Sequence, residues 1–311
     1  MRCEECGQPL DHLLCSNCQS DQRGGLFSIA RQSLPSNLLF YLAAIVRSRL
    51  YLGLLFLAIT PILLLDLRIN VVVGMMVYFS LFWFFVFQPL LATHIKISPL
   101  IVDVGAYIFT GLVGTTLAMI VESFWYTHGG APWLNARSFM LAAPAYVVFV
   151  GITEEFAKQI VVLIVLGVQR LRGKVWPPLT YMMLGVSSGL GFSAVENISY
   201  VEHGIAFEVM RHAFGLGTFT ALTRALYTPF LHAIWAGIAA WGFGQVAANG
   251  FTRWRVGVGL LSLAAILHGI YDAGIARHPI LAIFDVAGSY LLFLALLLNS
   301  RRRNRRRVVK A

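Results

Sequence analysis

Two glutamates and a lysine stand together in a segment that is otherwise apolar enough to cross a bilayer. The segment runs from Phe139 to Leu166, and its charged residues are Glu154, Glu155 and Lys158. A charge near the centre of a membrane helix costs about 2.5–3.5 kcal/mol on insertion scales. The three charges must therefore neutralise one another or serve a chemical purpose.

Three later apolar segments carry further ionisable residues. Glu196 and Asn197 stand in the first of these segments, His232 in the second, and His268 and Asp272 in the third. Ionisable groups at such positions usually face the interior of a helix bundle and mark a functional site. We therefore predict that all four segments contribute side chains to one shared cavity.

The spacing of the residues restricts their pairing. Glu154 and Lys158 are four residues apart and can neutralise each other along one helix face, which leaves Glu155 to face the cavity. Lys158 could equally pair with Glu155, three residues away, and the sequence does not choose between these pairs. His268 and Asp272 share a face, so the carboxylate could orient the imidazole or both could bind one metal ion.

The composition indicates the class of protein that holds these residues. Of the 311 residues 58% are apolar and 12% are charged, whereas soluble domains carry about 25% charged residues. The sequence therefore predicts an all-α polytopic membrane protein. Basic residues on the cytoplasmic flanks of spans explain the net charge of +10, so we expect no nucleic-acid partner.

About eight transmembrane helices are expected within residues 50–298, with the chemistry-bearing core at about residues 139–277. Both termini are expected in the cytoplasm, because that orientation places 18 of the 24 Lys and Arg inside. The ionisable residues then lie between the midplane and the outer leaflet of the plasma membrane. The expected spans are Leu50–Leu65, Val71–Leu91, Leu100–Val121, Phe139–Leu166, Leu179–Val201, Leu222–Ala247, Val256–Ile275 and Ile280–Leu298.

The N-terminus predicts a separate zinc ribbon over residues 1–20. Its two CxxC pairs, Cys3 with Cys6 and Cys15 with Cys18, could present four thiolates to one zinc ion. Buried thiols or two disulfides are the alternative. Residues 21–49 are expected to form a basic linker with an interfacial helix.

The basic tail, residues 299–311, follows the last expected span directly. Its run Arg301–Arg307 holds six arginines. Such a run is typical of a stop-transfer signal and of an anchor for anionic lipids.

The ordered set of motifs resembles the PrsW family of membrane-embedded proteases, within the group of CAAX-processing-type proteases. The residues that carry the resemblance are Glu154-Glu155-x-x-Lys158, Phe192-x-x-x-Glu196-Asn197, His232 and His268-x-x-x-Asp272. The resemblance implies hydrolysis of a peptide bond in a membrane-anchored protein, of the anti-sigma-factor type, on the external side. The CAAX-processing relatives usually have a histidine where this chain has Glu196, which argues against prenyl-protein processing.

The catalytic residues expected from this resemblance support two mechanisms. In the first, Glu155 deprotonates water while His232 and His268 position it or stabilise the oxyanion, Asp272 fixes His268, and Glu154 pairs with Lys158.

The second mechanism adds a catalytic zinc ion. Glu196, His232, His268 or Asp272 would hold the zinc, with Glu155 again as the base. Both mechanisms need the same residue types, so the sequence leaves the choice open.

Two other functions use the same residues. An ion-coupled transporter could use the carboxylates and histidines as a relay, although the sequence shows no inverted repeat and no pair of broken spans. A catalytically silent scaffold or sensor could recruit a cytoplasmic partner through the zinc ribbon. Asp103 and Asp285, near span ends, are expected to be structural.

Overall fold

A computed structural model describes residues 53, 55–61, 70–92 and 100–310. The chain divides into two units, Met1–Leu55 and Phe56–Ala311. The first unit lies almost wholly outside the described residues, and with it the expected zinc ribbon, basic linker and interfacial helix.

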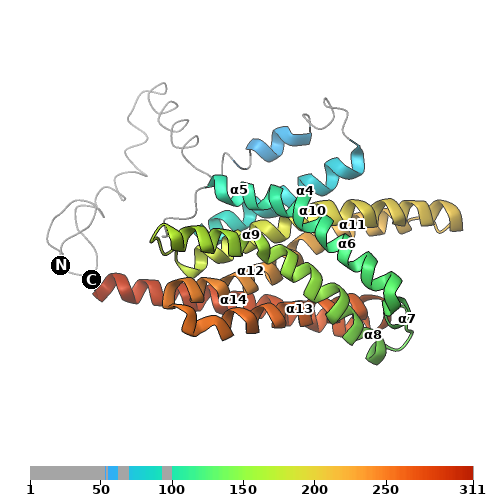
Figure 1. Ribbon diagram of the computed structural model, residues 1–311. Helices are drawn as coiled ribbons and strands as arrows, with labels where there is room; N and C mark the ends of the chain where they lie inside the picture. The colour runs from blue at the N-terminus through green and yellow to red at the C-terminus, as the bar shows by residue number, and fades with distance from the viewer. Residues whose placement is uncertain (1–52, 54, 62–69, 93–99, 311) are drawn as a thin grey trace, which may run out of the picture. The chain divides into compact units, whose positions relative to one another are not determined.

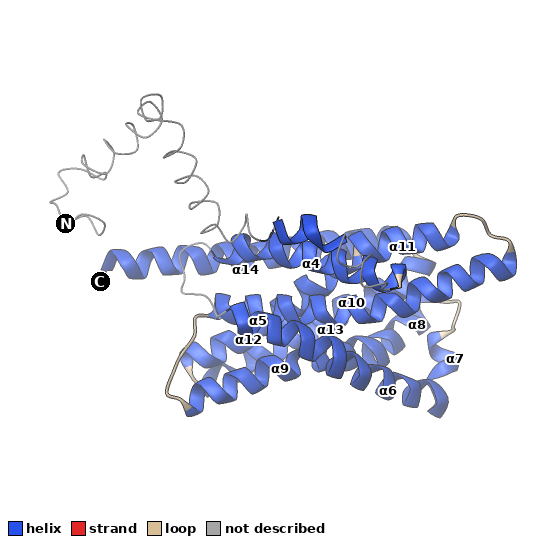
Figure 2. Cartoon of the chain, turned by 90° about the horizontal axis from the view of Figure 1, so that it is seen from above, coloured by secondary structure: helices blue, strands red, loops and turns tan. Residues whose placement is uncertain are grey.

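The described part of the second unit is helical and contains no strand (Figures 1 and 2). This confirms the predicted all-α class. The elements are α4 (Val71–Ala92), α5 (Leu100–Phe109), η2 (Thr110–Gly114), α6 (Thr115–Trp125), η3 (Tyr126–Gly130), α7 (Ala131–Leu134), α8 (Phe139–Tyr146), η4 (Val147–Gly151), α9 (Ile152–Leu171), α10 (Pro178–Arg211), α11 (Leu216–Leu226), α12 (Thr228–Asn249), η5 (Phe251–Arg253), α13 (Trp254–Arg277) and α14 (Pro279–Lys310).

Five helical segments of the described part are long and apolar enough to cross a membrane. They are Val71–Leu91, Leu100–Leu134, Leu216–Asn249, Phe251–Arg277 and Pro279–Arg301. The membrane class is therefore confirmed, whereas the expected count of eight spans is not. Two expected spans, Phe139–Leu166 and Leu179–Val201, do form helices, but these helices contain the charged residues discussed above.

The helices extend beyond the ends of two expected spans, Leu100–Val121 and Leu179–Val201. Residues 122–134 complete α6 and, after a kink at His128 and Gly129 in η3, form α7, and residues 202–223 complete α10 and form most of α11. The polar residues and glycines in these segments do not end the helices at the expected boundaries. These helices matter for the site, because α6 carries Glu122 and α11 carries Arg224.

The centre of the bundle is α10, which packs against α4, α5, α9, α11 and α12 (Figure 1). It is buried without interruption from Leu179 to Ala194, and α12 is buried from Leu231 to Gly242. A helix that is apolar and buried all round belongs to the core of a bundle. The site residues of α10 and α12 therefore lie on the least accessible helices.

Glycines set the short separation between the helices that carry the site. A Cβ at Gly189 of α10 would overlap the backbone carbonyl of His232 on α12. A Cβ at Gly151, just before α9, would overlap the carbonyl of Ala265 on α13. Small residues at crossings let membrane helices approach closely, and here they bring the polar side chains of neighbouring helices into contact.

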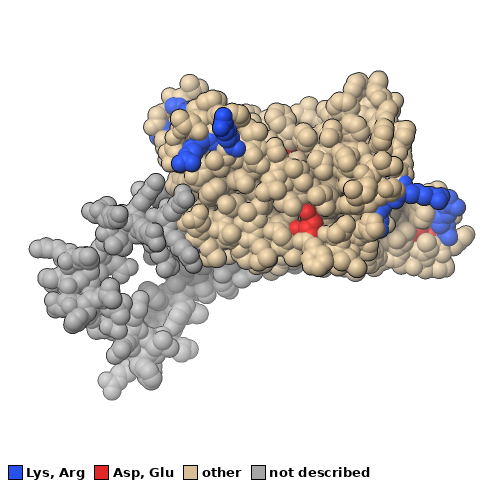
Figure 3. All heavy atoms as spheres, turned by 90° about the horizontal axis from the view of Figure 1, so that it is seen from below, with Lys and Arg blue, Asp and Glu red and all other residues tan. Residues whose placement is uncertain are grey.

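The outer surface suits a lipid environment. Large apolar side chains are exposed along α4, α6 and α14, for example Val86, Ile120 and Leu291. On the face seen from below, Lys and Arg side chains gather toward two ends, and the surface between them shows one acidic patch and is otherwise almost uncharged (Figure 3). An apolar band between charged ends is the arrangement expected of a protein that spans a bilayer.

Candidate active site

Four neighbouring helices bring the expected polar residues together in the interior. Their positions follow from the helix crossings described above, and each histidine contacts carboxylates from other helices. The contributions are Glu154, Glu155 and Lys158 from α9, Glu196 and Asn197 from α10, His232 from α12, and His268 and Asp272 from α13. A five-residue π-helical segment, η4, directly precedes α9, and such segments are frequent at functional sites.

Lys158 bonds both glutamates of its own helix. Its Nζ lies 2.8 Å from Oε1 of Glu155 and 3.1 Å from Oε2 of Glu154. The Phe192 ring lies 4.4 Å from the same nitrogen, and Lys158 has no exposed surface. The expected division, with Glu154 neutralised and Glu155 left to face a cavity, therefore differs from the structure.

His268 lies between the two glutamates. Its Nδ1 is 3.0 Å from Oε1 of Glu155, and its Nε2 is 3.6 Å from Oε2 of Glu154. Asp272, one turn along α13, approaches the same Nε2 at 3.4 Å. The predicted contact between Asp272 and His268 is thus present, but a second carboxylate holds the other ring nitrogen. The Trp235 ring stacks on the imidazole with centroids 4.5 Å apart.

His232 is held in a similar way. Its Nε2 lies 3.1 Å from Oε2 of Glu196, and its Nδ1 lies 3.9 Å from Oε2 of Glu154. The Phe192 ring stacks on its imidazole with centroids 5.7 Å apart. Each histidine therefore has one nitrogen beside an orienting carboxylate and turns the other nitrogen toward Glu154.

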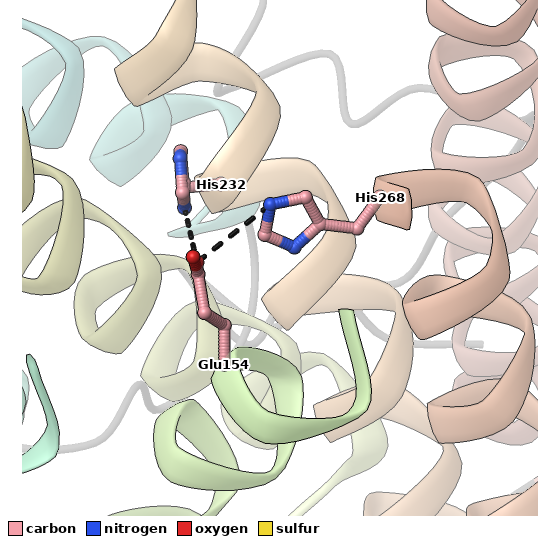
Figure 4. A group of neighbouring side chains, drawn as sticks. All are labelled: Glu154, His232 and His268. Atoms are coloured by element: carbon pink, nitrogen blue, oxygen red, sulfur yellow. Dashed lines mark ion pairs between the residues drawn. The ribbon is translucent and has the colours of Figure 1, made fainter. Parts of the chain in front are cut away.

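Glu154, His232 and His268 form a group that fits a metal ion (Figure 4). One candidate ligand atom from each residue lies within 4.8 Å of the other two. Atoms bound at 2.0–2.2 Å to one zinc ion can be at most about 4.4 Å apart, and both Glu154–histidine distances meet that limit. The Nδ1 of His232 is buried and has no hydrogen-bond partner among the described residues, as a nitrogen reserved for a metal would be.

Two further carboxylates complete the fit of this group to a metal ion. Histidines that bind metals usually turn their second nitrogen to a carboxylate, which fixes the ring. Glu196 and Glu155 stand at those second nitrogens. The donor types, two imidazoles and a carboxylate, are those of hydrolytic zinc sites.

Two charged residues at this site escaped the sequence analysis. Arg224 of α11 lies 3.4 Å from Glu196, whereas the sequence places it only at the external end of the expected span Leu222–Ala247. Glu122 of α6 interacts electrostatically with Glu154, Glu196 and Asp272, and its Oε1 is buried without a hydrogen-bond partner among the described residues. Ala118, one helical turn before Glu122, packs on Ala157 of α9.

The remaining expected residues have different places. Asn197 is fully buried next to Glu196 and hydrogen-bonds Ser193 and Arg224. Asp103 is buried and accepts a hydrogen bond from Gln88, and Asp285 of α14 is also buried. The four cysteines expected to bind zinc lie outside the described residues.

Ionisable side chains gathered inside a helical membrane protein occur in membrane-embedded enzymes and in ion-coupled transporters. The model of the PrsW family of intramembrane metalloproteases matches residues 98–299, a stretch that includes every helix of the site. The chain belongs to this family, and it is a peptidase. No curated protein and no solved structure matches the chain.

Proposed function

We propose that the chain hydrolyses a peptide bond of a membrane-anchored protein at the cluster formed by Glu154, His232 and His268. The observation that carries this proposal is the orientation of both imidazoles. Each is held at one nitrogen by a separate carboxylate and turns the other toward Glu154, and Asp272 also approaches that nitrogen of His268. A purely structural ion pair between Glu154 and Lys158 would not need this arrangement.

Glu154, His232 and His268 are the residues that would hold the metal ion of the family. When bound, the ion would supply a Lewis acid for the scissile carbonyl and the attacking water. Glu155 and Glu196 would keep the two imidazoles in place. Lys158 balances part of the negative charge of the two glutamates, which otherwise would be buried without compensation.

Asp272 is the carboxylate best placed to take the proton of the attacking water. It contacts the imidazole of His268, and its side chain is 23% exposed, against 4% for Glu154 and none for Glu155. Neither Asp272 oxygen is within ion-pair distance of Lys158. After attack, the same carboxyl can return the proton to the leaving amine as the C–N bond breaks.

The substrate is a membrane-anchored protein of the anti-sigma-factor type, cut on the external side of the plasma membrane. The excess of Lys and Arg on one set of connections supports cytoplasmic termini, and that orientation makes the cavity lean outward. The arginines after Ser300 would then lie against anionic lipids. The paired cysteines at residues 3–18 would bind a structural zinc ion in the cytoplasm.

Mass spectrometry of protein N-termini in membranes tests this function. Membranes from cells with the wild-type chain are compared with membranes from cells with Asp272→Asn or with no chain. We expect new N-termini in membrane-anchored proteins only with the wild type, and a loss of about 10²–10⁴-fold with Asp272→Asn.

The control for that comparison is Glu202→Gln, since Glu202 is exposed on α10. It should yield the wild-type pattern of termini. Identical termini with and without the chain would refute the proposed function. An ion flux lost in the Asp272→Asn membranes, with unchanged termini, would favour the transporter instead.

A further inference from the structure

Arg224 connects the helix α11 to the site, although neither the motifs nor the proposed chemistry includes it. Its Nη1 lies 3.4 Å from Oε1 of Glu196 and donates a hydrogen bond of 3.1 Å to Oδ1 of Asn197. The Tyr200 ring lies 3.4 Å from the centre of the guanidinium. The side chain is 20% exposed, so the contacts form at the rim of the buried cluster.

The backbone of Arg224 is fixed by the same asparagine. Nδ2 of Asn197 donates to the Arg224 carbonyl at 2.8 Å and to Oγ of Ser193 at 2.7 Å. The Thr228 hydroxyl contacts both Oδ1 of Asn197 and the Arg224 carbonyl. Both ends of the arginine are therefore tied to Asn197, which is fully buried. This degree of restraint is unusual for a charge that only faces a membrane surface.

Glu196 connects Arg224 to His232, one of the two histidines of the cluster. Glu196 meets Arg224 with one oxygen and His232 with the other, at 3.4 and 3.1 Å. A carboxylate with only one of these partners could rotate about its last bond. With both partners in place, the plane of the Glu196 carboxylate is fixed, and the ring of His232 is fixed with it.

We propose that Arg224 is a positioning residue of the proteolytic site, which holds Glu196 and thereby turns Nδ1 of His232 toward Glu154. This inference rests on the proposed function, because it assigns a role to the orientation of His232. It also assigns a role to α11, because this helix places Arg224 beside Glu196 of α10. A charged guanidinium suits the task because its Nη1, which carries two hydrogens, meets both the Glu196 carboxylate and the amide oxygen of Asn197.

The test measures binding of Zn²⁺ to the purified full-length chain. The isotherm of His232→Ala is subtracted from each titration, so that only the site that depends on His232 is followed. Arg224→Met removes the charge and keeps an unbranched side chain against Tyr200, whereas Arg224→Lys keeps the charge. Arg211→Met is the matched control, because Arg211 is exposed at the end of α10.

We expect Arg224→Met to weaken this Zn²⁺ binding about 10–100-fold, the usual effect of losing an outer partner of a metal ligand. Arg224→Lys should lose clearly less, and Arg211→Met should bind as the wild type does. Thermal unfolding is followed in parallel. Should Arg224→Met fail to fold, Arg224→Gln replaces it, since glutamine keeps a hydrogen-bond donor without charge.

Unchanged Zn²⁺ affinity in Arg224→Met, or an equal loss in Arg224→Lys, would overturn the inference. Failure of the proposed function gives a different result. In that case the wild type and His232→Ala would bind Zn²⁺ identically, before any arginine variant is considered.

Discussion

Replacing Glu154 by glutamine is expected to reduce peptide cleavage by at least about 100-fold, because loss of even an outer partner of a metal ligand costs about 10–100-fold and Glu154 would hold the metal ion itself. Oε2 of Glu154 is the acceptor that faces His232, His268 and Lys158 together. An amide in its place has no charge and offers only one acceptor oxygen. If its nitrogen occupied the Oε2 position, a donor would face the lysine.

The variant is measured by the appearance of the substrate's new N-terminus in reconstituted membranes, beside the exposed control Glu202→Gln. The folded fraction of Glu154→Gln should stay close to that of the wild type, since Lys158 keeps its shorter contact with Glu155. Full cleavage by Glu154→Gln would show that the reaction takes place elsewhere. Loss of folding together with activity would instead assign Glu154 to structure.

Replacing Lys158 by methionine should have the largest effect on stability. The lysine is completely buried and contacts two carboxylates, with Phe192 packed over its ammonium group. Removing one partner of a buried ion pair costs about 3–5 kcal/mol, because the other charge stays buried and uncompensated. Two carboxylates lose their partner here, so we expect thermal unfolding in detergent at a much lower temperature.

A second substitution separates charge from packing. Adding Glu155→Gln to Lys158→Met removes one of the two uncompensated carboxylates and should recover part of the lost stability. Lys174→Met, at an exposed position after α9, is the control and should unfold as the wild type does. An unfolding temperature of Lys158→Met equal to that of the control would contradict the role given to the ion pair.

The gathering of the site residues was the most predictable feature of this sequence. Glu154, Glu196, His232 and His268 each interrupt an apolar segment, and lipid tolerates such groups only in a bundle interior. Their helices do pack together, and the histidines do meet carboxylates of other helices. The physical reason is the cost of an ionisable group in lipid, which acts on every segment independently.

The pairing inside the cluster could not be predicted. Helical spacing allows Lys158 to reach Glu154 or Glu155, and the structure shows contacts with both. His268 approaches Glu155 from another helix, so that Oε1 of Glu155 contacts both Lys158 and His268. Distances between helices decide such pairings, and those distances depend on glycines such as Gly189 that no local pattern singles out.

Arg224 and Glu122 were missed for a different reason. Both stand near the ends of expected spans, where charged residues are normal and point to loops or membrane surfaces. Helices α10 and α11 instead continue beyond the expected boundary, and their contact places Arg224 over Glu196. The helix-period pattern of residues 216–226 was the available signal, and the glycines at its start obscured it.

The metal content of the purified full-length chain is the most direct test of the account. Wild type is compared with the double variant His232→Ala/His268→Ala, which leaves all four N-terminal cysteines unchanged. If Glu154, His232 and His268 form the metal centre, each wild-type chain carries one divalent metal ion more than the double variant. Equal metal content in the two proteins, with peptide cleavage retained by the wild type, would contradict it.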